Sequence, residues 1–129
     1  MPDHCLERKV YYHDTDAGGV VYYGTYLKFL EEGRTEFCRE RGVDTKALFE
    51  QGTAFVVVHA EMDYKSPARY GDTITVTSRV EKIGTSSIHF YQEIRIGRIV
   101  GVVARIVWAC VTPEFRTQPV MPEIRQALL

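Results

Sequence analysis

Residues 12–26 read YHDTDAGGVVYYGTY and change from a polar, turn-prone segment into the start of an amphipathic helix. The segment carries two carboxylates, Asp14 and Asp16, and then passes through Gly18 and Gly19. This order can place a carboxylate beside the unpaired N–H groups of a helix N-terminus. A base or nucleophile next to such an oxyanion site is an arrangement used in acyl transfer.

The residues that follow have the periodicity of a helix lying on a sheet. From Val20 to Glu40, apolar side chains recur at helical spacing, and the charged side chains lie mostly elsewhere. Gly33 lies on the apolar side, where the missing Cβ lets the helix approach a sheet closely. The pair Arg41-Gly42 predicts the end of the helix. The predicted apolar face consists of Tyr23, Tyr26, Leu27, Leu30, Gly33 and Phe37.

Strands dominate the remainder, separated by the turn signals Gly71-Asp72, Gly84-Thr85 and Gly97-Arg98. The last strand is mostly apolar, so we expect both its faces to be covered. If the strand before Pro67 is regular, four of its residues share one face: Phe55, Val57, His59 and Glu61. The expected strands are Arg8–Tyr12, Thr53–Lys65, Thr73–Ile83, Ser87–Ile96 and Ile99–Val111, with short helices at Thr45–Gln51 and Glu123–Leu128.

This order, β-α-β-β-β-β, predicts an α+β fold with one long helix on a largely antiparallel sheet. A chain of 129 residues favours a single domain over residues 1–129. Such a sheet is too large for one chain to cover both faces and both edges, so we expect pairing between chains.

Composition excludes several classes of function. The net charge of −1 gives no electrostatic reason to expect nucleic-acid binding. The cysteines Cys5, Cys38 and Cys110 form no C-x-x-C pair, so we expect reduced thiols and neither disulfides nor zinc. No apolar run resembles a signal peptide or is long enough to span a membrane, which makes the cytoplasm the expected location.

The most specific motif is DTDAGGVVY at residues 14–22. Further, less specific positions of the same chain-long signature lie at Val10-Tyr11-Tyr12, Tyr26, Glu31, Arg34-Thr35-Glu36, Ala54-Phe55-Val56-Val57, Tyr64, Pro67-Ala68-Arg69, Asp72 and Gly84-Thr85-Ser86. On these residues the chain resembles the 4-hydroxybenzoyl-CoA thioesterase family, and within it the YbgC-like acyl-CoA thioesterase branch. The resemblance implies the hotdog fold, a five-stranded, largely antiparallel sheet wrapped around one long helix.

The resemblance also implies roles for the residues of the motif. The second aspartate of the family's D-x-D is the catalytic carboxylate, which is Asp16 here. The family polarises the thioester carbonyl through a backbone N–H at the helix start, which falls at Tyr23 or an immediate neighbour. Many YbgC-like chains carry His where this chain has Tyr23. The backbone role survives this change, and a side-chain role of that His would either be missing here or be taken by the Tyr23 hydroxyl. From pattern alone, Asp16 could equally cap the helix, and Asp14 sets the turn.

Further residues are candidates for substrate binding. Gly19 would let substrate approach the backbone. Tyr22 is either a pocket or a core residue, and His59 is either a buried or interface residue or lines the pocket. The family binds CoA phosphates near surface loops across a subunit boundary, which makes a set of cations and turn residues candidates: Lys65, Arg69, Lys82, Gly84, Thr85 and Ser86. A D-x-D pair without a third ligand at sensible spacing does not predict a metal site.

The resemblance implies an acyl-CoA thioesterase that releases a carboxylate and CoA, needs no cofactor beyond the CoA of its substrate, and forms a homodimer or homotetramer. Asp16 would act as nucleophile or general base. The alternative is a protein of lipid metabolism that binds acyl-CoA or acyl carrier protein as a scaffold with little turnover. A hotdog dehydratase or hydratase is disfavoured because its helix motifs are missing. The acyl preference, and CoA against acyl carrier protein as the carrier, stay open.

Overall fold

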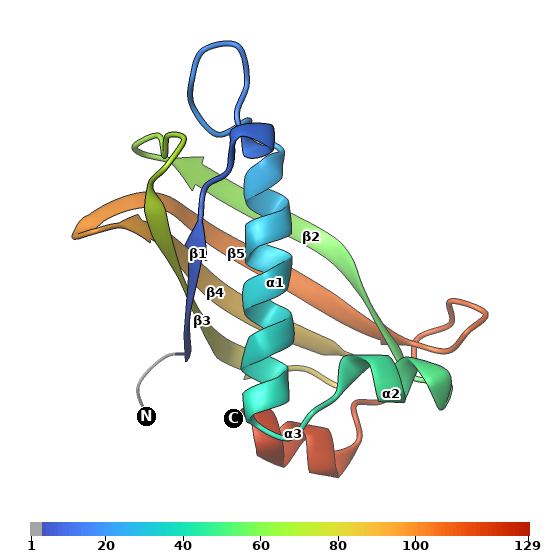
Figure 1. The fold of residues 1–129 in the computed structure, drawn as a ribbon. Helices are drawn as coiled ribbons and strands as arrows, with labels where there is room; N and C mark the ends of the chain where they lie inside the picture. Colours follow the sequence, from blue (N-terminus) through green and yellow to red (C-terminus); the bar gives the residue numbers. More distant parts are fainter. Residues whose placement is uncertain (1–3) are drawn as a thin grey trace.

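The computed structural model describes residues 4–129, which form one five-stranded sheet with helices packed on one of its faces (Figure 1). The elements are β1 His4–Lys9, the 3-10 turn Tyr12–Asp14, α1 Thr25–Glu40, α2 Thr45–Glu50, β2 Ala54–Tyr64, β3 Thr73–Ile83, β4 Ser87–Ile96, β5 Ile99–Val111 and α3 Pro122–Leu128. The bounds predicted for the last three strands are confirmed to the residue.

The sheet is antiparallel throughout, with the strand order β1-β3-β4-β5-β2. The consecutive strands β3, β4 and β5 form hairpins through glycine-bearing turns, while β1 and β2 close the two edges. Strand β1 runs beside the first half of β3, so that Lys9 lies opposite Thr73. The chain segment around Asp14 therefore leaves the sheet at the end where β3 begins.

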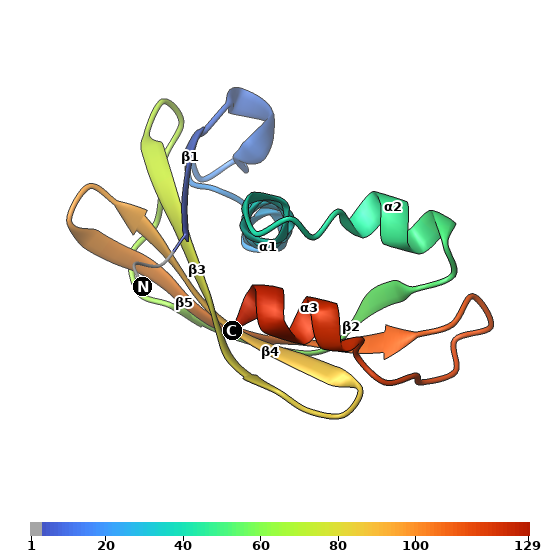
Figure 2. The same ribbon diagram turned by 90° about the horizontal axis from the view of Figure 1, so that it is seen from below.

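Helix α1 packs across the sheet and supplies much of the core. Seen from below, α1, α2 and α3 all lie on the same side of the sheet (Figure 2). The buried residues of α1 recur at helical spacing: Tyr26, Phe29, Leu30, Gly33, Arg34, Phe37 and Cys38. Of the predicted apolar face, Tyr23 and Leu27 prove exposed, and Phe29 takes a buried position instead.

The close approach predicted at Gly33 is confirmed. A Cβ atom built on Gly33 would lie 2.6 Å from Val76 Cγ1 and 3.1 Å from both Gln92 Nε2 and Ser78 Oγ. The buried amide of Gln92 donates to the Leu30 carbonyl and to Ser78 Oγ, both at 2.9 Å. The helix is thus held on the sheet by polar bonds as well as apolar contact.

Two predicted element bounds near the motif are wrong. The first strand ends at Lys9 and does not reach Tyr12, because the Val10 N–H donates to the Asp72 carbonyl and the chain then enters the 3-10 turn. The long helix begins at Thr25, five residues later than Val20. Val20 and Val21 are instead held extended, bridged to Arg69 and Thr15 respectively.

A β-bulge overturns the predicted face of His59. The register of β2 on β5 shifts between Val57 and His59, so that Val57 lies opposite Trp108 while His59 lies opposite Val107. Residues paired across antiparallel strands share a face. Phe55 and Val57 therefore face the core side, and His59 and Glu61 lie on the outer face.

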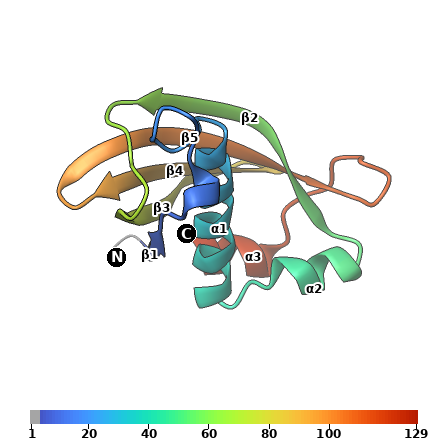
Figure 3. The ribbon, with the colours of Figure 1, turned by 45° about the horizontal axis from the view of Figure 1, so that its top comes forward.

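Within a single chain one face of β5 is buried and the other is partly covered, so the expectation that both faces are covered stays a prediction. Its alternate residues Val102, Ala104, Ile106, Trp108 and Cys110 are buried, whereas Arg105 between them is exposed. Figure 3 shows β2 as the outermost strand along one edge of the sheet, and Val57 and Val58 are 49% and 60% exposed there. An uncovered apolar edge is consistent with the predicted pairing between chains, which stays a prediction.

Candidate active site

Asp16 opens a tight turn that presents its carboxylate to solvent. The Asp16 N–H donates to the Val20 carbonyl at 2.9 Å, and the Gly19 N–H donates to the Asp16 carbonyl at 3.0 Å. Gly19 has φ of +81°, a conformation that side chains with a Cβ seldom adopt. The Gly18 N–H donates to Asp16 Oδ1 at 2.8 Å, which fixes the orientation of the exposed carboxylate. The Asp16 turn, residues 15–21, therefore holds the carboxylate in a defined orientation.

This carboxylate lies on the wall of an open cavity of about 430 Å³. The rings of Tyr12 and Tyr70 meet edge-on beside it, with centroids 5.8 Å apart. Sequence reasoning missed both tyrosines as wall residues, although Tyr70 follows the Pro67-Ala68-Arg69 match directly. The cavity is lined by Tyr12, Thr15, Asp16, Ala17, Gly19 and Tyr70.

The segment between the Asp16 turn and α1 offers hydrogen-bond donors. The Tyr22 N–H bonds the Asp14 carbonyl and the Thr25 N–H bonds the Tyr22 carbonyl. Within residues 4–129, the N–H groups of Tyr23 and Gly24 donate to no acceptor. They lie at the start of α1, whose dipole places partial positive charge there. These donors suit an oxygen that gains negative charge during a reaction.

The Tyr22 side chain links this segment to Asp16. Its ring lies 4.8 Å from that of Tyr23, centroid to centroid. The pKa of the Tyr22 phenol is raised, mainly by its hydrogen bond with the Tyr23 phenol and also by the nearby Asp16 charge. Tyr22 therefore contacts Tyr23 and lies within reach of the Asp16 charge, and the helix itself starts further along the chain than predicted.

The loop after β2 supports the start of α1. Tyr64 Oη donates to the Tyr23 carbonyl at 3.1 Å, and the Ala68 N–H donates to Tyr26 Oη at 3.0 Å. The Val21 N–H bonds the Ala68 carbonyl at 2.8 Å. A smaller cavity of about 260 Å³ opens between these parts, with Lys65 on its wall. The donors before α1 are thus anchored on two sides.

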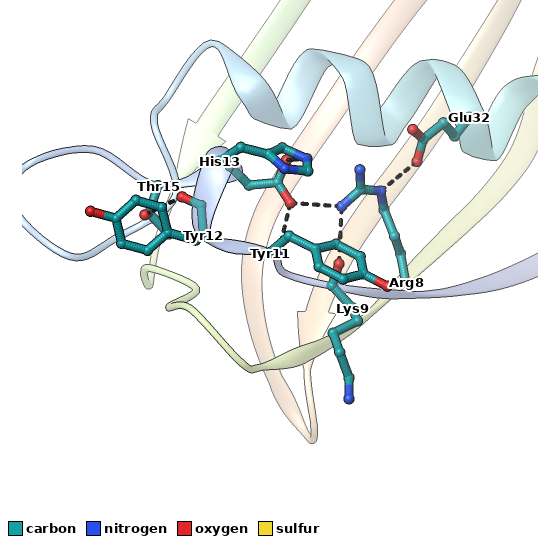
Figure 4. A network of polar contacts seen from close by, with 8 residues as sticks. Arg8, Lys9, Tyr11, Tyr12, His13, Thr15 and Glu32 are labelled. Carbon is teal, nitrogen blue, oxygen red and sulfur yellow. Dashed lines mark hydrogen bonds and ion pairs between the residues drawn. The ribbon is translucent and has the colours of Figure 1, made fainter.

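Asp14 has a structural environment. Its side chain is 4% exposed and accepts hydrogen bonds from Arg8 Nη1 and from the Tyr11 N–H, each at 2.9 Å. The Arg8 guanidinium also bonds Glu32 on α1 at 2.8 Å, so it ties the loop to the helix (Figure 4). Burial acts to raise the pKa of the Asp14 carboxyl, but the bonds from Tyr11 and Arg8 outweigh burial and lower it.

Replacing Asp14 by Asn should lower the free energy of unfolding by about 1–3 kcal/mol at neutral pH. Because the folded pKa lies below the ordinary value of 3.8, the stabilisation from Asp14 is present above that value. It is lost as the pH falls through the folded pKa. Urea unfolding between about pH 7 and pH 3 should therefore show a shallower acid loss in Asp14→Asn than in wild type. The exposed Asp63→Asn is the control, and parallel curves for wild type and Asp14→Asn would contradict the assignment.

The sequence profile of the thioesterase superfamily matches residues 18–103. The chain belongs to this superfamily. The acyl-CoA thioester hydrolase YbgC of Escherichia coli O157:H7 is 40% identical over 86 residues, which cover 67% of this chain and 64% of that protein. The match thus spans less than two thirds of that relative. The acyl-CoA thioesterase YbgC of Haemophilus influenzae is 38% identical over 80% of this chain and 76% of that protein.

Solved structures of the superfamily share the fold. A probable thioesterase from Bartonella henselae is 31% identical, with a TM-score of 0.88 over 92% of this chain and 99% of that one. A hypothetical protein from Aquifex aeolicus is 25% identical, with a TM-score of 0.93 over 98% and 99% of the two chains. The predicted hotdog fold and the resemblance to the YbgC-like branch are confirmed. No helix in residues 4–129 is long and apolar enough to cross a membrane.

The superfamily fold brings only part of the predicted site together in one chain. Gly19 lines the same cavity as Asp16, Tyr22 is influenced by the Asp16 charge, and Tyr23 lines the smaller cavity. Lys65 lies on the wall of the smaller cavity near Tyr23, and Arg69 bridges Val20 beside the Asp16 turn. His59 lies on the outer face of β2, where its Nε2 is 2.9 Å from Glu61 Oε1.

The predicted phosphate-binding turn lies at the other end of the sheet. Because Lys9 is paired with the first residue of β3, the chain enters the Asp16 turn near Thr73. Lys82 lies at the opposite end of that strand, and residues 84–86 follow it. The C-terminal segment uses the backbone of this turn: Arg125 donates to the Ile83 and Gly84 carbonyls, and the Val120 N–H bonds the Thr85 carbonyl. Within one chain this turn does not join the Asp16 site.

Metal binding finds no support in the part of the chain that the structure describes. Residues 4–129 contain no group of three or more His, Cys, Asp or Glu side chains placed to hold an ion. The prediction that the site needs no metal stays a prediction.

Proposed function

We propose that the protein is an acyl-CoA thioesterase that hydrolyses an acyl-CoA to a free carboxylate and CoA. The observation that carries the proposal is the exposed Asp16 carboxylate, oriented by the Gly18 N–H and followed within eight residues by the unpaired N–H groups of Tyr23 and Gly24 at the start of α1. The names of the YbgC relatives support the same activity. The reaction as proposed uses no cofactor other than the CoA carried by the substrate.

Two routes fit this geometry. In the first, an Asp16 oxygen attacks the thioester carbon, the C–S bond breaks to release CoA thiolate, and water then hydrolyses the mixed anhydride. In the second, Asp16 takes a proton from water, and the resulting hydroxide attacks the same carbon and expels the thiolate. Either route places negative charge on the carbonyl oxygen, where the N–H of Tyr23 or Gly24 stabilises it.

The assembly and the CoA site are part of the proposal. Two chains paired along an edge of the sheet would cover exposed apolar side chains, giving a homodimer or a dimer of dimers. Lys65 and Arg69 are near enough to the Asp16 site to bind the carrier in the same chain. Lys82, Gly84, Thr85 and Ser86 could do so only for the site of another chain. An acyl carrier protein is the alternative carrier.

The test is thiol release from short, medium, long and aromatic acyl-CoAs, followed with a colorimetric thiol reagent. Turnover of at least one ester would support the proposal and would rank the acyl groups. If the folded protein binds these esters and releases no thiol from CoA or acyl carrier protein, the proposed activity is wrong. The scaffold alternative would then account for the binding.

The Tyr23 side chain should matter little, because the proposed role belongs to the backbone. Tyr23→Phe removes the phenol hydroxyl and retains the N–H, so kcat should stay within about threefold of wild type. Steady-state kinetics on the best ester would check this, with Tyr22→Phe as the matched control for the neighbouring phenol. A loss of about 100-fold or more in Tyr23→Phe alone would assign the hydroxyl a catalytic role.

A further inference from the structure

A separate cavity lies beside the middle of α1, away from the Asp16 turn. Its volume is about 430 Å³, within the range of about 300–1,000 Å³ typical of small-molecule pockets. Its walls come from α1, α2, the start of β2 and the end of β5, and they are mainly aromatic and aliphatic. We call it the Arg34 cavity, after the most buried charged residue among those that line it, which include Glu31, Arg34, Phe49, Phe55, Trp108 and Phe115.

Arg34 is an unusual wall residue because it is a buried cation. It is 4% exposed, and its Nη1 donates to Gln92 Oε1 at 3.0 Å. Its guanidinium lies 5.7 Å from the centroid of the Trp108 ring. Its Nε, also buried, has no hydrogen-bond partner within residues 4–129. Burial lowers the pKa of Arg34 to about 10, which leaves the group charged at neutral pH.

No carboxylate of the described residues forms an ion pair with Arg34 within 4.0 Å. Glu31 is the nearest acidic influence and acts to raise the pKa of Arg34, but its side chain is exposed and accepts a hydrogen bond from Thr35 Oγ1 at 3.1 Å. Buried charges in proteins are normally paired, because removing them from water is costly. Arg34 is therefore a buried cation without an ion pair, and it lies on the wall of a cavity that is otherwise mainly apolar.

We propose that the Arg34 cavity binds an apolar acyl group whose far end carries a carboxylate or another hydrogen-bond-accepting oxygen, and that Arg34 selects for that oxygen. The inference rests on the proposed function, since the occupant is the acyl part of the thioester. Phe55 and Trp108, whose rings stack with centroids 5.1 Å apart, provide a flat wall for the apolar body. The guanidinium pairs with the terminal oxygen.

Trp108 provides the measurement, because it is the single tryptophan of the chain and lines the cavity. Adipoyl-CoA and hexanoyl-CoA have six-carbon acyl groups that differ in a terminal carboxylate. Both are titrated into the full-length Asp16→Ala protein, which preserves the ester, while Trp108 fluorescence is followed. We expect Trp108 to respond to both ligands and adipoyl-CoA to bind about tenfold more tightly, the effect of one charge-assisted pair.

Two further substitutions test Arg34 in the same background. Arg34→Met, which keeps an unbranched apolar side chain and loses the charge, should reduce the adipoyl to hexanoyl ratio to about one. Glu31→Gln changes an exposed side chain and removes a repelling carboxylate, so it should raise the ratio about two- to threefold even if Arg34→Met does not fold. Equal binding of the two esters, or a ratio that is unchanged in both variants, would overturn the inference. Absence of hydrolysis by wild type would refute the proposed function and leave these binding ratios standing.

Discussion

Asp16→Ala is expected to lower kcat for acyl-CoA hydrolysis about a thousandfold while leaving the fold intact. The carboxylate is exposed, and within residues 4–129 its side chain accepts a hydrogen bond only from the Gly18 N–H, so its removal costs little packing. Residues 15–21 contain no other carboxylate that could attack the thioester or activate water in place of Asp16. Thiol release under saturating acyl-CoA gives kcat, and thermal unfolding of the same sample checks the fold.

Asp16→Asn refines this test. The amide oxygen can still accept the hydrogen bond from Gly18, so the turn keeps its shape, but the group no longer carries a charge or a basic oxygen. The Asn variant should therefore be as inactive as the Ala variant and closer to wild type in stability. Wild-type turnover by either folded variant would remove Asp16 from the reaction. Asp63→Ala, which changes an exposed carboxylate on β2, should retain wild-type activity.

Gly33→Val is expected to prevent stable folding, and Gly33→Ala to lower the free energy of unfolding by about 1–3 kcal/mol. Alanine in place of glycine ordinarily stabilises a helix by about 1 kcal/mol. Here the new Cβ would lie 2.6 Å from Val76 Cγ1, so helix and sheet would have to separate. That movement would also strain the bonds of Gln92 to Leu30 and Ser78.

Urea unfolding measures the effect of Gly33→Ala, and the control is Lys28→Ala on the exposed face of the same helix. The control also introduces alanine but touches no sheet residue, so it should change stability by less than about 0.5 kcal/mol. If Gly33→Ala proved as stable as wild type, the contact between α1 and the sheet would have to be looser than the structure shows.

The sequence predicted those parts of the fold that depend on local pattern. Strands β3 and β4 alternate between polar and apolar residues, and β5 is a mostly apolar run. Glycine turns separate the three strands, so their bounds follow from local pattern. The end of α1 follows from Arg41-Gly42, and Gly42 has φ of +79° there. The close approach at Gly33 followed from a glycine on an apolar helix face.

Predictions failed where distant residues decide the structure. Val20 and Val21 read as helix because their bridges to Arg69 and Thr15 are invisible in a local pattern. The prediction that His59 shares a face with Phe55 and Val57 assumed a regular strand. It fails because one bulge in β2 inverts the alternation beyond Val57. Gln92 interrupts an apolar run, and nothing nearby signals that it bonds Leu30 and Arg34.

In the candidate site, too, predictions held for residues adjacent in sequence and failed for distant ones. Asp16, Gly19, Tyr22 and Tyr23 are adjacent in sequence, so one motif could place them together. Lys82 and residues 84–86 were grouped with them by resemblance, but the β3–β4 hairpin carries that turn to the far end of the sheet. A single sequence does not show whether a second chain brings it back.

The spatial order of the strands has a consequence for synthesis on the ribosome. Strand β2 pairs with β5 and with no other strand among residues 4–129, and Tyr64 lies opposite Val102. Translation therefore releases β2 long before its partner exists. At 5–20 residues per second, the interval from Tyr64 to Val102 lasts roughly two to eight seconds. During that time the nascent chain carries an unpaired apolar segment, and the last strand to emerge is the one that shields it from aggregation.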